Sequence, residues 1–175
     1  EYLTWNRPGL ENSSGIKLME ADTATEEINM CAAGFKDEGD EKSLYALAEE
    51  NGLTKEDVED YLDDCVDELC NTSMAALGKL EVEEKALGAT HVMVDWISYI
   101  KTQCIKDETM ARAVRMKEKM LVGCMGAILK EAYNTRMNVP KEIVKAAGIG
   151  NCNVQLGMPG MARVNEIIKS YYLGE

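Results

Sequence analysis

A dense run of carboxylates is the part of this sequence best suited to chemistry with a charged partner. Between residues 55 and 69 the chain carries one cation, Lys55, and eight acids: Glu56, Asp57, Glu59, Asp60, Asp63, Asp64, Asp67 and Glu68. On a continuous helix, four of these acids recur at i, i+4, i+7 and i+11 and form one outward row: Glu56, Asp60, Asp63 and Asp67. The row would repeat about every 5–6 Å along the helix axis, and the phosphates of one DNA strand repeat about every 3.4 Å. Such a row predicts competition with nucleic acid for the Lys and Arg side chains of a partner. The alternative, an ordinary solvated acidic face, stays open.

A second group of candidate residues is basic and lies in the C-terminal part of the chain. It consists of Arg112, Arg115, Lys117 and Lys119, followed by Lys130, Arg136, Lys141 and Lys145. A surface built from these side chains could hold a phosphate backbone, and raised salt would then weaken the binding. The same cations could instead pair with the acidic half of the chain. Possible nucleic-acid contact through Arg112, Arg115, Lys117 and Lys119 is therefore one of two interpretations.

Few side chains are suited to catalysis. His91 is the one histidine of the sequence, which excludes sites built on two or more imidazoles, and no nucleophile is indicated beside it. The six cysteines form no CxxC pair and have apolar helical neighbours, so we expect buried free thiols. The turn at Gly157–Gly160 lacks the Gly-Lys-Ser/Thr of a nucleotide-binding loop. We expect no catalytic residues, no metal site and no cofactor, and hence a protein that is not an enzyme.

The acidic run must be positioned by the helix that begins next to Thr54. Thr54 can accept from the backbone N–H of Asp57, whose carboxylate can reach back, and this reciprocal pair is a capping box. The residues that follow form one apolar stripe at helical spacing: Val58, Tyr61, Leu62, Cys65, Val66 and Leu69. With the preceding helix and the Asn51-Gly52 turn, they predict a helix-turn-helix-like hairpin over residues 43–70. Because phosphates would repel so many carboxylates, direct DNA reading by the second helix is disfavoured.

The rest of the chain is also predicted to be helical. A short helix is expected from Thr23 or Thr25 to a stop at Gly34, and others over 73–87, 92–105, 107–133 with a break near Lys117, 140–147 and 161–172. Residues 153–156 are the one candidate strand. The predicted fold is therefore all-α, a compact bundle of about seven helices with at most one short strand pair. Residues 1–21 are predicted to be a loosely ordered N-terminal arm, and residues 22–175 a single helical domain.

The charge is distributed unevenly along the 175 residues. The net charge is −12, but residues 1–99 carry 7 basic and 24 acidic side chains, whereas residues 100–175 carry 12 basic and 7 acidic ones. The predicted domain therefore has an acidic half, 22–99, and a basic half, 100–175, which present different electric fields to partners. No apolar stretch approaches the roughly 20 residues of a membrane span, and no signal peptide is recognised. We expect a cytoplasmic protein of a bacterial host cell without a membrane partner.

Several sequence blocks resemble a known group of proteins. They are GFKDEGDE at 34–41, LAEENGLT at 47–54, DWISYI at 95–100, GC at 123–124, IVKAAG at 143–148, GMPGM at 157–161 and YYLG at 171–174. Together they resemble small acidic proteins carried by phages and mobile elements of gut Firmicutes, a group connected to anti-CRISPR proteins. The resemblance covers about residues 30–174. It implies a stoichiometric inhibitor of a guide-loaded type II CRISPR nuclease (Cas9), with no catalytic motif to carry over.

A weaker likeness leads to a second interpretation. Around residues 117–133 and in the last predicted helix, the chain resembles the PcfK-like proteins of conjugative elements. This likeness implies a DNA-associated accessory protein of a conjugative plasmid or a phage. Inhibition through an acidic, DNA-mimicking surface and an accessory role on DNA are therefore the two functions that the sequence predicts.

Overall fold

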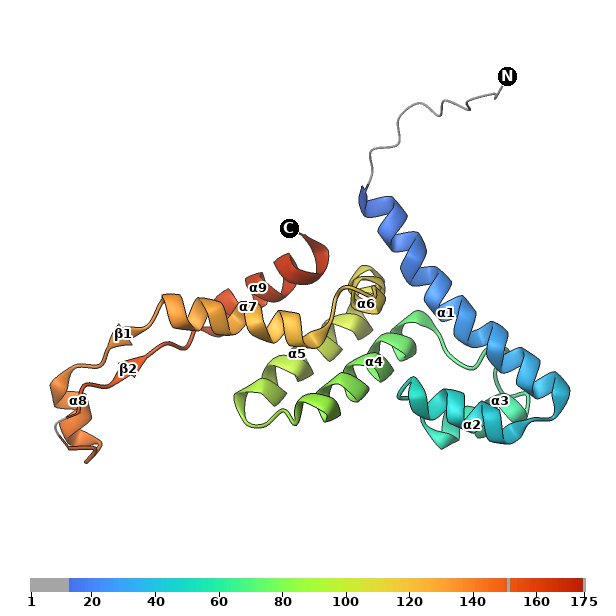
Figure 1. The fold of residues 1–175 in the computed structure, drawn as a ribbon, viewed down its shortest axis with the longest axis horizontal. Coiled ribbons are helices and arrows are strands. Elements are labelled where there is room, and N and C mark those ends of the chain that lie inside the picture. Colours follow the sequence, from blue (N-terminus) through green and yellow to red (C-terminus); the bar gives the residue numbers. More distant parts are fainter. Residues whose placement is uncertain (1–12, 151, 175) are drawn as a thin grey trace, which may run out of the picture.

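The helices and strands were located in a computed structural model that describes residues 13–150 and 152–174. Over these residues the fold is all-α with one pair of short antiparallel strands, as predicted, and it has nine helices where about seven were predicted (Figure 1). The elements are α1 (Ser13–Glu38), α2 (Glu41–Glu50), α3 (Lys55–Leu62), α4 (Thr72–Leu87), α5 (Val92–Lys106), α6 (Glu108–Arg115), α7 (Leu121–Asn134), β1 (Met137–Asn138), α8 (Lys141–Ala146), β2 (Gln155–Leu156) and α9 (Met161–Leu173). No helix among the described residues is long and apolar enough to cross a bilayer.

Short polar side chains fix the start of several helices. The predicted capping box is present: Asp57 N donates to Thr54 Oγ1 (3.2 Å), and Thr54 N donates to Asp57 Oδ2 (2.7 Å). Asp40 caps α2 by accepting from Ser43 N and Ser43 Oγ, and these hydrogen bonds lower the pKa of Asp40. Asn71 accepts from the backbone N–H of the third residue of α4 in the same way. The capping box at Thr54 was predicted from the sequence, whereas the caps at Asp40 and Asn71 were not, although each of them is also local.

The N-terminal elements form a first core, which lies at one end of the molecule (Figure 1). Its buried side chains come from α1, α2, α3, the segment 63–71 and the first turn of α4: Ile28, Ala32, Leu44, Ala48, Val58, Tyr61, Leu69, Cys70 and Ala75. We call residues 24–71, which supply nearly all of this core, the acidic head. Their apolar side chains point inward, so their many charged side chains are left on the surface.

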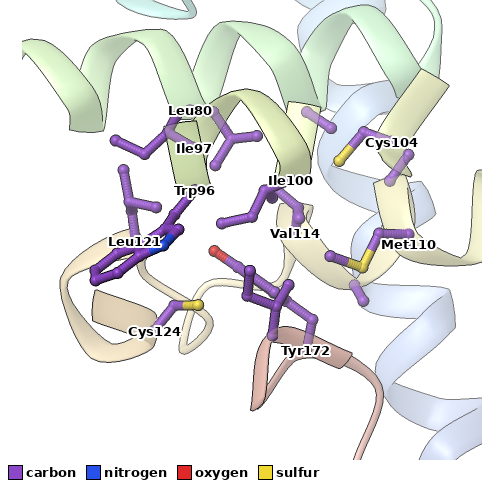
Figure 2. Packing of buried hydrophobic residues seen from close by; sticks show 14 of the residues in the cluster. Leu80, Trp96, Ile97, Ile100, Cys104, Met110, Val114, Leu121, Cys124 and Tyr172 are labelled. Carbon is purple, nitrogen blue, oxygen red and sulfur yellow. The ribbon is translucent and has the colours of Figure 1, made fainter. Parts of the chain in front are cut away.

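A second and larger core is built by α4, α5, α6, α7 and α9 (Figure 2). Leu80, Ile97, Ile100 and Val114 are fully buried in it, and Tyr172 of α9 closes it from the C-terminal end. Two thiols are part of this packing, and burial raises the pKa of Cys104 and of Cys124 to about 12. Helix α4 contributes to both cores, because Ala75 faces the first and Ala76 the second.

The head is joined to the second core by a close backbone contact. The turn between α2 and α3 lies against Gly78 of α4, where an added Cβ would be 2.0 Å from the carbonyl oxygen of Asn51. On the opposing side, Gly52 has a positive φ of 68°, and a Cβ there would lie 2.2 Å from the Gly78 carbonyl oxygen. Both positions therefore require glycine.

Residues 135–150 and 152–160 form an arm that extends away from the ends of α7 and α9 (Figure 1). Its two sides are β1 and β2, which pair with Met137 opposite Leu156, and α8 lies at its tip. The predicted strand at 153–156 thus contains β2, and the predicted helix at 140–147 contains α8. Among the arm's helical residues, Val144 is buried.

Two predictions at the N-terminus need correction. The helix predicted from Thr23 or Thr25 to Gly34 instead begins at Ser13 and continues to Glu38. Gly34 does not end it, because one glycine costs a helix only about 1 kcal/mol and Ile28, Ala32 and Phe35 give α1 a continuous packing face. Of the predicted N-terminal arm, residues 13–21 belong to α1, and residues 1–12 lie outside the described residues.

Candidate functional site

The predicted helix over the acidic run is too long. Helix α3 ends at Leu62, and Asp64 adopts a left-handed conformation (φ 57°). The N–H of Cys65 then bonds back to Asp60 O (2.9 Å) and that of Asp64 to Tyr61 O (3.4 Å), the two hydrogen bonds of a Schellman ending. Aspartate tolerates this conformation, and further carboxylates at the negative end of the helix dipole would destabilise a longer helix.

The prediction of one regular row of carboxylates is therefore wrong. Glu56 and Asp60 lie on α3, Asp63 caps its C-terminus, and Asp67 lies in the irregular segment 63–71. The predicted apolar stripe is interrupted at the same point, because Cys65 and Val66 are exposed while Leu69 remains buried. The run presents many carboxylates, but not at a phosphate-like repeat.

The structure nevertheless leaves most of the predicted acids exposed on the head. Seven of the eight are exposed: Glu56, Glu59, Asp60, Asp63, Asp64, Asp67 and Glu68; Asp57 is half-buried in its capping box. Asp64 pairs with Lys36 Nζ (2.5 Å), which raises the pKa of Lys36. The same ammonium donates to Tyr61 O (2.6 Å) and lies 4.5 Å from the centre of the Tyr61 ring.

Further acids, which no motif singled out, add to the exposed negative charge of the head. Helices α1 and α2 add Glu26, Glu27, Asp37, Glu38, Glu41, Glu49 and Glu50, all exposed. The head contains sixteen acidic and three basic side chains, a balance of −13. The charge arithmetic of the sequence indicated this excess, but local spacing could not show that three helices share it.

A groove runs between α1 and residues 67–72 of the head. Glu26, Asp67 and Glu68 line it together with Arg112 of α6 and with Met30, whose side chain is 74% exposed, in a volume of about 750 Å³. The three carboxylates outnumber this one guanidinium. Thr25 also lines the groove; it is 7% exposed, and its buried Oγ1 has no hydrogen-bond partner. The groove therefore combines negative charge, an apolar surface and an unsatisfied hydroxyl group.

Asn29 holds the two sides of this groove together. Its Nδ2 donates to Cys70 O (2.9 Å), and its Oδ1 accepts from Cys70 N (3.1 Å). These two bonds tie segment 67–72 to α1 across 41 positions of sequence. Sequence analysis missed the groove, because nothing local connects Asn29 with Cys70.

The four basic candidates do not form a comparable surface. Arg112 pairs with Glu108 (2.8 Å), Arg115 donates to Ala75 O (3.3 Å), and Lys119 donates to Tyr171 O. These three side chains are half-buried, and Lys117 is the exposed one of the set. Their geometry favours the interpretation that these cations act inside the molecule.

The basic side chains further along the chain are exposed. Lys130, Arg136, Lys141 and Lys145 are exposed at the end of α7 and on the arm. The Arg136 guanidinium lies 4.0 Å from the centre of the exposed Tyr133 ring. Large apolar side chains are exposed along the same stretch: Leu129, Tyr133, Met137, Ile143, Ile149, Leu156, Met158 and Met161. Sequence analysis did not anticipate this apolar exposure.

Neither the histidine nor the cysteines gather into a reactive centre in the described part of the chain. His91 is exposed at the start of α5, and its side chain makes no capping bond. All six cysteines are free, but the prediction of buried thiols is wrong for Cys31, Cys65 and Cys152, which are exposed. Over residues 13–150 and 152–174, no group of three His, Cys, Asp or Glu side chains could hold a metal ion.

The candidate site is therefore the acidic head with its groove, and the arm is a second exposed surface at the other end of the molecule (Figure 1). Comparisons of this chain with protein-family models, with curated proteins and with solved structures found no match. The geometry of these two surfaces is thus the basis on which a function can be assigned.

Proposed function

We propose that this chain is a stoichiometric inhibitor of a type II CRISPR nuclease and that its acidic head binds the nuclease. The observation that carries this proposal is the exposure of fourteen carboxylates on the head, which contains three cations. The sequence resemblance to anti-CRISPR proteins supplies the class of target.

The physical basis of the proposal is competition for positive charge. Nucleases of this type hold guide RNA and target DNA in positively charged channels and read the short adjacent motif with arginines. A compact head of charge −13 would be attracted to such a channel and would exclude the DNA phosphates from it. Because the acids do not repeat at phosphate spacing, the proposal rests on the density of exposed charge and on the groove.

The deciding experiment is DNA cleavage by the guide-loaded nuclease with this protein added at equal molar amount. We expect cleavage to stop, and we expect the effect to weaken as salt rises. The triple variant D60N/D63N/D67N should bind about tenfold more weakly, from roughly 0.5 kcal/mol for each exposed ion pair lost. The matched control D60E/D63E/D67E retains the charge and should inhibit like the natural chain.

Two results would contradict this proposal. Cleavage that continues in a molar excess of the protein would exclude inhibition of that nuclease. A binding affinity for the nuclease that is unchanged in D60N/D63N/D67N, with an unchanged circular dichroism spectrum, would exclude these three carboxylates of the head as the binding surface. Inhibition by a substoichiometric amount would instead indicate a catalytic mechanism.

A DNA-associated accessory role is the second candidate function. The observation that favours it is the exposure of Lys130, Arg136, Lys141 and Lys145 around the arm, because exposed cations can neutralise phosphates. A gel-shift assay with duplex DNA separates the two candidates. Tight, salt-dependent DNA binding by the protein alone, without any complex with the nuclease, would favour the accessory role.

A further inference from the structure

The arm leaves most of its large apolar side chains exposed to solvent. Met137, Ile143, Ile149, Leu156 and Met158 all lie within residues 135–160, and each is 55–62% exposed. Exposed apolar side chains gathered on one projecting element are typical of an interaction surface. The arm is therefore suited to contact another macromolecule through its apolar side chains.

The positive charge of the arm indicates which kind of partner it can contact. Arg136, Lys141 and Lys145 are exposed on it, and Glu142 is its one acid, so the arm has a charge of +2. Two arms would repel each other, which disfavours a dimer formed arm to arm. A nucleic acid would satisfy the cations but would leave most of the apolar side chains in water. An acidic surface that also exposes apolar side chains suits both features.

We propose that the arm of one molecule docks in the groove of the acidic head of a second copy of this chain. The groove offers Glu26, Asp67 and Glu68 to the lysines of α8, and Met30 to its apolar neighbours. The arm cannot reach the groove of its own molecule, because the two lie at opposite ends (Figure 1).

The dimensions of the two surfaces are compatible. Lys141 and Lys145 are four residues apart on α8, so their side chains lie on one face about 6 Å apart. The carboxylates of the groove stand on both of its sides, Glu26 on α1 and Asp67 and Glu68 on the opposite segment.

Docking of this kind joins different surfaces of the two molecules. The contact is head to tail, so it extends into short chains or closes into a ring, depending on the rotation between neighbours. It uses opposite charges, so it weakens as salt rises. It does not require a nuclease, so it can be tested on the protein alone, although it uses the same head that the proposed function assigns to the nuclease.

Sedimentation velocity of the protein alone tests this proposal. At about 50 mM salt we expect the average mass to rise with protein concentration, and at about 500 mM salt we expect the monomer. The arm variant K141E/K145E and the head variant D67K/E68K should each associate at least about tenfold more weakly. The matched control K106E/K169E changes two exposed lysines outside the arm and the head, and should associate like the natural chain.

Mixing the two reversed variants gives the sharpest result. The acidic arm of K141E/K145E complements the basic groove of D67K/E68K, so an equimolar mixture should associate although neither variant does so alone. Circular dichroism confirms that both variants are folded. A natural chain that is monomeric at every concentration and salt would overturn the proposal. So would association unchanged by the reversals, a mixture that stays monomeric, or a monomer whose arm lysines bind duplex DNA instead.

Discussion

Replacing Lys79 should destabilise the second core more than replacing any exposed lysine would. The Lys79 ammonium donates to three carbonyl oxygens at the turn between α6 and α7, those of Val114 (2.6 Å), Met116 (2.8 Å) and Lys119 (3.0 Å). It also lies 3.8 Å from Glu83 Oε1, and the other oxygen of Glu83 accepts from Leu121 N (2.6 Å) at the start of α7. One Lys–Glu pair on α4 thereby holds the end of one helix and the beginning of the next.

The magnitude follows from these contacts. Each hydrogen bond to a charged group contributes about 1.5–3 kcal/mol, and the cost of burying the ammonium, which lowers the pKa of Lys79, offsets part of the sum. Breaking a buried ion pair from one side costs about 3–5 kcal/mol. Because the side chains of Lys79 and Glu83 are each 16% exposed, we take the lower end of that range. We expect Lys79→Met to lose about 3 kcal/mol, a large fraction of the 5–15 kcal/mol typical of a domain.

Urea unfolding followed by far-UV circular dichroism measures this loss. Lys85→Met is the matched control, because Lys85 lies on the same helix and is exposed, and its loss should stay within about 0.5 kcal/mol. A loss below about 1 kcal/mol for Lys79→Met would refute the reasoning. It would mean that water replaces the ammonium at the three carbonyl groups without cost.

Three further predictions concern glycines and thiols. Gly78→Ala should destabilise the folded protein by about 1–3 kcal/mol, because the added Cβ would meet Asn51 O. Gly34→Ala should instead stabilise it by about 0.5–1 kcal/mol, because the space around Gly34 in α1 is open. The midpoints of urea unfolding of the two variants measure both effects. A maleimide should label Cys31, Cys65 and Cys152 rapidly in the folded protein and the buried Cys70, Cys104 and Cys124 only after denaturant is added, as counted by mass spectrometry. Burial raises the pKa of the three buried thiols from 9.0 to about 11 or 12, so between about pH 8 and pH 10 the unfolded chain releases protons that the folded chain retains. Stability should therefore fall over that interval by about 1.3 kcal/mol per thiol, and an unchanged urea midpoint would contradict it.

The sequence predicted those parts of the fold that local chemistry controls. The capping box at Thr54 and Asp57 and the glycine end of α4 at Gly88 are set by residues within a few positions of one another. The break before α7 was also predicted, although distant contacts from Lys79 and Glu83 of α4 stabilise it. The end of α3 was not predictable in this way. The apolar stripe continued to Leu69, but the backbone reverses at Asp64, an aspartate in a conformation usually left to glycine.

The amino-acid composition predicted that the candidate site is acidic, but the sequence did not predict the groove or the exposed arm. The excess of acids in the N-terminal half led to the head, because like charges must lie on the surface wherever they are not paired. The groove depends on Asn29 reaching Cys70, and the exposure of the arm depends on α7 and α9 ending where they do. Both are relations between distant parts of the chain, which hydrophobic periodicity does not encode.

Ion pairing explains why the negative charge of the chain acts at the head and not over the whole predicted acidic half. Helices α4 and α5 belong to that half by sequence, but they fold into the second core, where Glu81 and Glu84 pair with Lys101 and Glu83 pairs with Lys79. Their carboxylates are thereby largely neutralised within the molecule. The head has three lysines for sixteen acids, so its field cannot be cancelled internally. That field must be met by salt ions or by a cationic partner, and release of those ions on binding favours the partner most strongly at low salt. The nuclease channel and the arm of a second copy both satisfy this requirement, so ionic strength should modulate each of the two proposed interactions.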